Sequence, residues 1–235
     1  MTAWTTVLFD FSGTLLRIEP AETWLRAVLR EAGTPMAEDE IVRAARALEE
    51  AGALPGGGAP RELPAELADA WRIRDRTPEL HRGVYTALSR RVALPDPALH
   101  DALYDRHMTP DAWQPYPDAL EVLRELRARG LRVGVVSNIG WDLRPVFRAH
   151  GLDLYVDAYT LSFEHGVQKP EPELFRIALD ALDAEAERTL MVGDDRRADG
   201  GAAALGCAVR FVDHLPVGRR PDALRGVLDA VSASA

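Results

Sequence analysis

Short, largely apolar segments alternate with amphipathic helical segments in the second half of the chain. The segments 131–136, 189–192 and 208–212 show no polar alternation, and 5–9 near the start has the same pattern. Strands that are buried on both faces have such sequences, and strands separated by helices form parallel sheets. The pattern therefore predicts an α/β fold, with a Rossmann-like parallel sheet as its core and helices on both faces.

A long stretch without strand patterns separates the first predicted strand from the second. Apolar side chains at helical spacing predict helices in this stretch at 21–32, 41–51, 65–74, 78–93 and 97–106. Later in the chain we expect helices at 118–129, 143–150, 173–182, 198–205 and 221–231, and a short strand at 155–161. We therefore predict an α/β core of residues 1–16 and 115–235, into which residues 17–114 are inserted as an all-helical cap domain.

The composition is that of a globular protein with an acidic surface. Of 235 residues, 47% are hydrophobic and 28% are charged, and the formal net charge is -9. An acidic chain without a basic patch is a poor ligand for nucleic acid, so we expect no nucleic-acid partner. The apolar segments are too short to span a bilayer, so we expect no membrane partner. No basic region followed by a long apolar run opens the chain, which favours a cytoplasmic protein.

Polar side chains follow the predicted strands. Asp10 follows the first strand, Ser137 and Asn138 end the second, and Asp194 and Asp195 follow the strand at 189–192. Ligands of an open parallel sheet bind beyond the carboxyl ends of its strands. We therefore expect these side chains to meet in one crevice.

The remaining candidates are the turn residues Ser12 and Thr14, together with Lys169 and Asp199. Lys169 is the single lysine among 28 basic residues. Several carboxylates in one crevice repel each other unless a cation joins them, and oxygen ligands suit Mg²⁺. A carboxylate can attack a phosphoryl group if a lysine, hydroxyls, backbone N–H groups or a metal ion neutralise the phosphoryl oxygens. These residues therefore predict a Mg²⁺ site that takes a small phosphorylated molecule.

Four motifs follow one another along the chain: Asp10-Phe11-Ser12-Gly13-Thr14-Leu15, Val135-Val136-Ser137-Asn138, Lys169-Pro170, and Gly193-Asp194-Asp195 with Asp199. In this order they resemble the motifs of the haloacid dehalogenase (HAD) superfamily. Each motif alone is weak, but four in this order on the expected elements form a specific pattern. The resemblance covers the whole predicted core, and the inserted helices lie where many members of the family carry a helical cap.

The resemblance implies a hydrolase, most often a phosphatase, in which Asp10 is the nucleophile and forms an aspartyl-phosphate. It implies that Thr14, Ser137 and Lys169 hold the phosphoryl oxygens. The candidate catalytic residues are Asp10, Ser12, Thr14, Ser137 and Lys169, and the candidate substrate-binding residues are Ser137, Asn138 and Lys169. By the same resemblance, Asp10, Asp194 and the backbone carbonyl of Ser12 bind Mg²⁺, while Asp195 and Asp199 orient the metal-bound water from behind.

Ser12 departs from the family pattern, because phosphatases of the family usually carry an aspartate two residues after the nucleophile. That aspartate protonates the leaving group and then activates water, and a serine hydroxyl is too weak an acid to replace it. The sequence leaves three readings open: a slow or unusual phosphatase, a 2-haloacid dehalogenase, or a phospho-ligand-binding protein without catalysis. A dehalogenase also lacks this aspartate, but it needs no metal and has little use for Asp194 and Asp195 beside an anionic substrate.

Other residues are expected to have structural roles. His81, Tyr85, Arg74 and His107 are expected on solvated helix faces of the cap and outside the site. A phosphonate-cleaving mechanism needs a lysine in the cap, and the chain has none there. Cys207, the single cysteine, excludes an internal disulfide and is expected to be buried.

Overall fold

The structure, a computed structural model, describes residues 4–232. Its centre is a five-stranded parallel sheet with the order β5-β4-β1-β6-β7. The strands are β1 (Thr6–Phe9), β4 (Arg132–Ser137), β5 (Ala158–Leu161), β6 (Thr189–Gly193) and β7 (Ala208–Phe211). Phe9 at the end of β1 lies between Val135 of β4 and Val192 of β6. The residues that follow these three strands therefore leave the sheet at the same edge.

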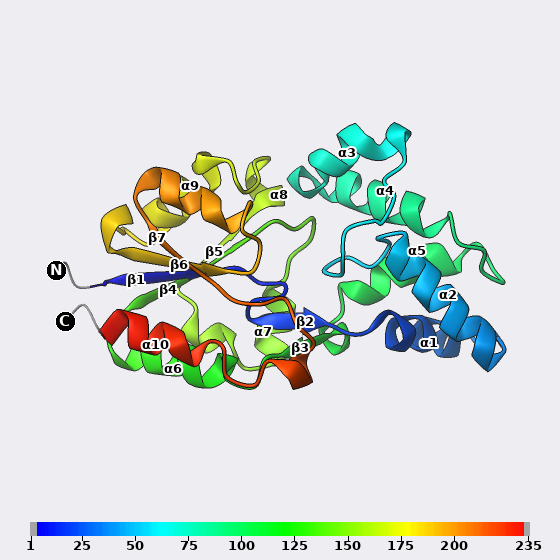
Figure 1. Ribbon diagram of the computed structural model, residues 1–235, viewed down its shortest axis with the longest axis horizontal. Helices are drawn as coiled ribbons and strands as arrows, with labels where there is room; N and C mark the ends of the chain where they lie inside the picture. The colour runs from blue at the N-terminus through cyan, green and yellow to red at the C-terminus, as the bar shows by residue number, and fades with distance from the viewer. Residues whose placement is uncertain (1–3, 233–235) are drawn as a thin grey trace.

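Helices cover both faces of this sheet, with α6 and α10 on one face and α9 on the other (Figure 1). The helices of this part are α6 (Ala119–Ala128), α7 (Arg144–Ala149), α8 (Ser162–His165), α9 (Pro172–Ala181) and α10 (Arg225–Ser232). The predicted α/β fold with helices on both faces of a parallel sheet is confirmed. Within residues 4–232, no helix combines the length and the apolar character needed to cross a bilayer.

The inserted helices gather beyond the carboxyl ends of the strands, on the side of the molecule opposite α10 and the start of β1 (Figure 1). They are α1 (Ala21–Glu31), α2 (Glu38–Glu50), α3 (Ala68–Arg72), α4 (Pro78–Ser89) and α5 (Leu99–His107). Most of their buried apolar side chains belong to the same hydrophobic cluster as those of β1 and β4, and within the insertion the buried Trp24 indole donates a hydrogen bond to the Leu103 carbonyl (2.8 Å). The predicted helical insertion is therefore present.

A two-stranded antiparallel sheet that the sequence did not predict links the insertion to the core. β2 (Leu16–Ile18) pairs with β3 (Trp113–Pro115). Both strands are too short to show a sequence period. The predicted domain limits, 16/17 and 114/115, cut through these paired strands, and the division at those residues stays a prediction.

Three predicted elements differ in the structure. The segment 65–74 is split between the 3₁₀ turn Ala65–Leu67 and α3, and a second 3₁₀ turn, η2 (Arg74–Arg76), follows. The segment 198–205 forms a 3₁₀ helix, η6 (Asp199–Leu205), in which Gly200 and Gly201 weaken α-helix formation. The strand predicted at 155–161 begins only at Ala158, where pairing with β4 starts.

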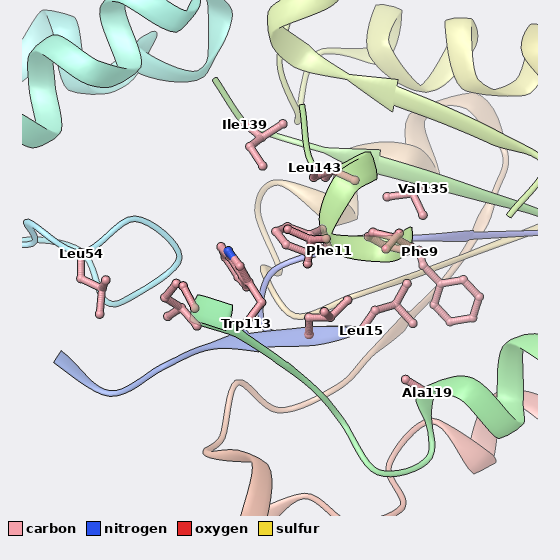
Figure 2. Packing of buried hydrophobic residues seen from close by; sticks show 14 of the residues in the cluster. Phe9, Phe11, Leu15, Leu54, Trp113, Ala119, Val135, Ile139 and Leu143 are labelled. Carbon is pink, nitrogen blue, oxygen red and sulfur yellow. The ribbon is translucent and has the colours of Figure 1, made fainter. Parts of the chain in front are cut away.

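Buried aromatic side chains fix the loop that follows β1. Phe11 lies between Trp113, whose ring centroid is 4.3 Å away, and Phe147, at 5.8 Å. Figure 2 shows Trp113 between Phe11 of the core and Leu54 of the loop that enters from the insertion. The residue directly after Asp10 is therefore anchored in a rigid core, which limits how far Asp10 can move.

Candidate active site

A cavity of about 190 Å³ lies between the carboxyl ends of the strands and the inserted helices. Its lining contains all the predicted site residues except Thr14: Asp10, Ser12, Ser137, Asn138, Lys169, Asp194, Asp195 and Asp199. The structure therefore brings together side chains that are separated by up to about 190 positions in the sequence. The expectation that strand-end residues meet in one crevice agrees with this arrangement.

Lys169 joins two carboxylates at the bottom of the cavity. Its ammonium lies 2.7 Å from Asp10 Oδ1 and 2.6 Å from Asp199 Oδ1. All three side chains are buried. Such charge-assisted hydrogen bonds are short and strong, and they fix the direction in which the Asp10 carboxylate points.

Burial and neighbouring charges shift the pKa values of Asp10, Asp199 and Lys169. Burial raises the pKa of Asp10 to about 8, although the positive charge of Lys169 opposes this effect, and the negative charges of Asp199 and Asp194 add to it. Burial also raises the pKa of Asp199. The two carboxylates outweigh the effect of burial on Lys169 and raise its pKa, so it stays a cation. A further cation would therefore stabilise the ionised form of Asp10.

Three carboxylates could hold that cation. One oxygen from each of Asp10, Asp194 and Asp199 lies within 4.8 Å of the others. The Thr14 hydroxyl lies below them, 3.3 Å from Asp10 Oδ2 and 3.4 Å from Asp194 Oδ1. Oxygen ligands alone fit a hard ion such as Mg²⁺ better than zinc or copper.

Gly13 allows the loop after β1 to pass close to Asp194. Its φ is +82°, a conformation that favours glycine, and a Cβ on it would lie 2.5 Å from Asp194 Oδ2. The same Cβ would overlap the His214 ring. The glycine of the first motif is therefore needed for the approach of the two acidic loops.

Two predicted residues hold the backbone around the site. The Asn138 side-chain amide donates to the Lys169 carbonyl (2.9 Å), and its oxygen accepts from the Lys169 backbone N–H (2.7 Å). Asp195 Oδ1 accepts from the N–H groups of Arg197 and Ala198, at 2.8 and 2.9 Å, and its own N–H donates to Asp199 Oδ2. These contacts support positioning roles for Asn138 and Asp195, and contact of Asn138 with substrate stays a prediction.

Ser12 faces the loop at Pro55 to Gly57 across the cavity. Its hydroxyl donates to the Gly56 carbonyl (3.3 Å), and the Arg17 guanidinium donates to the same oxygen (3.0 Å). This hydroxyl therefore already has an acceptor. The position at which family phosphatases carry their acid–base aspartate serves here as a contact to the insertion.

The expectation that four polar residues of the insertion face solvent is wrong. His81, Tyr85 and His107 are buried, and with Arg74 they line the cavity. Burial lowers the pKa of His81 well below its usual value and that of His107 to about 3, so both rings are neutral. His81 and Tyr85 are four residues apart on α4, a spacing that places them on one face and could have indicated a shared environment.

Sequence reasoning also missed three residues that hold the acidic loops. His214 contacts Asp194 and Arg17. The buried Arg220 donates to the Gly13 carbonyl (2.5 Å) and to that of Thr14, and its guanidinium lies on the Tyr116 ring. Arg17, His214 and Arg220 belong to no motif, so the sequence carried no signal for them.

An acidic cluster with a lysine at the carboxyl edge of a parallel sheet, below an inserted helical unit, is the arrangement that the four motifs predict. The model of the haloacid dehalogenase-like hydrolase family matches residues 4–206. The chain therefore belongs to this family of hydrolases.

Relatives within the family act as phosphatases or as dehalogenases. A ribulose-1,5-bisphosphate 5-phosphatase from Halopiger xanaduensis is 34% identical over 118 residues, which are 49% of this chain and 48% of that protein. The chain thus spans about half the length of this relative. The solved structure of the Bacillus subtilis HAD-hydrolase YfnB bound to magnesium matches with a TM-score of 0.65 and 22% identity, over 90% of this chain and 89% of that one.

A dehalogenase solved with an intermediate complex matches about as well. Its TM-score is 0.63 at 21% identity, over 89% of this chain and 84% of that one. At such identities the two solved structures show a shared fold and do not separate the two chemistries. The distinction depends on the residues of this site.

Proposed function

We propose that this protein is a Mg²⁺-dependent phosphatase that hydrolyses a small phosphate ester through an aspartyl-phosphate on Asp10. The observation that carries the proposal is the cluster of Asp10, Asp194 and Asp199 around one point, beside Lys169. Lys169 supplies one positive charge against these three carboxylates, so without a further cation the ionised cluster would repel an anionic substrate. With one, it can accept a phosphoryl group.

Asp10, Asp194 and the carbonyl of Ser12 would hold the Mg²⁺, which supplies positive charge for the phosphoryl oxygens and keeps Asp10 ionised. Asp199 fits a positioning role, because its two oxygens already accept from Lys169 and from the Asp195 N–H.

In the first step an Asp10 oxygen attacks phosphorus, and the bond from phosphorus to the leaving oxygen breaks. Thr14, Ser137 and Lys169 stabilise the charge on the phosphoryl oxygens. Water then attacks the phosphorus of the aspartyl-phosphate, which releases inorganic phosphate and restores Asp10.

Ser12 favours a second candidate, a 2-haloacid dehalogenase in which Asp10 attacks carbon. One experiment separates the two. The native protein is assayed with aryl and alkyl phosphates and with 2-haloacids, each with Mg²⁺ and with a chelator. We expect phosphate release that the chelator abolishes.

Halide release that persists in the chelator would replace the proposal with the dehalogenase. Binding of phosphorylated ligands without turnover of any of these compounds would indicate a binding protein.

Changing Ser12 to aspartate is expected to raise the steady-state hydrolysis of alkyl phosphates by no more than about 10²-fold, the lower range for a general acid–base, and the gain reaches that size only where no other side chain already supplies the acid. The new carboxyl can protonate a poor leaving group, and aryl phosphates need this help less. The measurement is the ratio of alkyl to aryl turnover in both proteins. Ser12→Asn, of the same size without an acid, is the control. A gain as large with asparagine would show that the effect is not acid catalysis.

A further inference from the structure

The segment 72–76 of the insertion is tied to the core around Lys169. Two hydrogen bonds reach this segment from the core: the Gln168 side-chain amide donates to the Arg72 carbonyl (2.8 Å), and the Ser162 hydroxyl donates to the Asp75 carbonyl (2.5 Å). Arg76 of the segment also forms an ion pair with Glu171 (2.8 Å). Ser162 also accepts from the N–H of Ile139, which follows the second motif (2.8 Å). Asp75 is therefore held against the catalytic loops of the core.

Asp75 lines the cavity that contains Asp10 and Ser12. Its side chain is only 4% exposed. Its neighbours are Arg74, whose nearest guanidinium nitrogen is 3.5 Å away, and His81, whose Nε2 is 3.8 Å away. Both distances exceed that of an ordinary hydrogen bond, so neither group forms a close hydrogen bond with the Asp75 carboxyl.

The surroundings of Asp75 have opposite effects on its pKa. Burial raises the pKa of Asp75, while the charges of Arg74 and Lys169 lower it. The other facing groups, His81 and Tyr85, are neutral, because burial lowers the pKa of His81 and raises that of Tyr85. The Tyr104 hydroxyl lies 2.7 Å from His81 Nδ1 and holds this ring in place.

We propose that Asp75, supplied by the insertion, is the general acid and base that position 12 lacks. This role rests on the proposed phosphatase. In the first step the protonated Asp75 carboxyl gives its proton to the leaving oxygen as the bond from phosphorus to that oxygen breaks. In the second step the Asp75 carboxylate takes a proton from the water that attacks the aspartyl-phosphate. One ester and one water thus give one alcohol and one phosphate, and Asp75 regains its proton.

The test is Asp75→Asn, which keeps the size of the side chain and removes its acid. With 4-nitrophenyl phosphate, whose leaving group needs no proton, we expect a burst of one nitrophenol per active site at close to the native rate. The steady-state rate that follows should fall by about 10²–10³-fold, because the water step has lost its base. With an alkyl phosphate, the burst itself should disappear.

Two comparisons complete the experiment. Asp69→Asn removes an exposed carboxylate on α3, the helix that precedes this segment, where Asp69 pairs with Arg72 at 3.1 Å, and it should change neither rate. The double variant Ser12→Asp/Asp75→Asn should hydrolyse alkyl phosphates at least about tenfold faster than Asp75→Asn alone, because Ser12→Asp returns an acid to the cavity. Asp75→Ser serves the same purpose if the amide disturbs folding, which near-ultraviolet circular dichroism monitors.

The outcomes separate this inference from the function on which it rests. A native protein that hydrolyses no phosphate ester contradicts the phosphatase itself. If the native protein is active and Asp75→Asn keeps its steady-state rate, or loses the aryl burst along with it, Asp75 is not the acid–base. If Asp75 were only a structural partner of Arg74, its replacement would lower the burst and the steady-state rate together.

Discussion

Asp10→Asn is expected to lower phosphate ester turnover by about 10⁴-fold or more, because an amide oxygen cannot attack phosphorus as a carboxylate does. The fold should persist. Lys169 keeps Asp199 as a partner at 2.6 Å, and burial already disfavours a charge on Asp10. We therefore expect the free energy of unfolding to change by no more than about 1–2 kcal/mol.

The covalent step can be measured directly. The native protein, mixed with an aryl phosphate and quenched in acid, should gain the mass of one phosphoryl group, and fragmentation should place it on Asp10. The Asp10→Asn protein should gain none. Hydrolysis retained by the purified variant, or a phosphoryl group found on another residue, would contradict a nucleophilic Asp10.

The acidic half of the site could be predicted because its position follows from topology. Asp10 and Asp194 each follow a strand that is buried on both faces, and Ser137 is the last residue of another. Such strands are recognisable from local sequence. Once the strands are parallel and adjacent, their carboxyl ends must meet. No knowledge of side-chain packing was needed for this step.

The half of the cavity that comes from the insertion could not be predicted in this way. His81 and His107 lie on helices whose sequences have the polar character of a solvated face, and they are buried only because α4 and α5 lie over the cavity. Docking of the insertion on the core depends on contacts such as that of Arg76 with Glu171, 95 positions apart. Local patterns contain no information about contacts of that kind.

The short strands β2 and β3 illustrate the same limit. Leu16 pairs with Pro115 across almost the whole insertion, and each strand has only three residues. The pairing arises because the chain must leave the core and return to it at one place. It follows from the architecture and not from strand propensity.

Lys169→Met should both destabilise the protein and remove its activity, and the loss of stability should depend on pH. Without the ammonium, Asp10 and Asp199 face each other in a buried site, and leaving such charges unpaired costs about 3–5 kcal/mol. Turnover should fall by at least about 10²-fold, because one group that stabilises the phosphoryl oxygens is gone.

The sign of the pH dependence follows from the direction of the pKa shifts. Burial raises the pKa of Asp10 to about 8 and also raises that of Asp199, so the folded protein binds protons more tightly there than the unfolded chain does. A group of this kind makes stability fall as pH rises from its unfolded pKa, about 4, towards its folded pKa. Removing Lys169 raises both folded pKa values further, so the variant should lose more stability than the native protein between pH 5 and pH 8.

Urea unfolding at pH 5 and pH 8 with a chelator present, so that no divalent cation shares the site, measures this difference. The gap between the two proteins should be about 1–2 kcal/mol at pH 5, where the carboxyls can take up protons, and about 3–5 kcal/mol at pH 8. Lys169→Arg keeps the charge and should therefore follow the native slope even if its larger side chain lowers stability at every pH. Parallel curves for the native protein and Lys169→Met would show that the two carboxylates do not depend on this lysine for their charge.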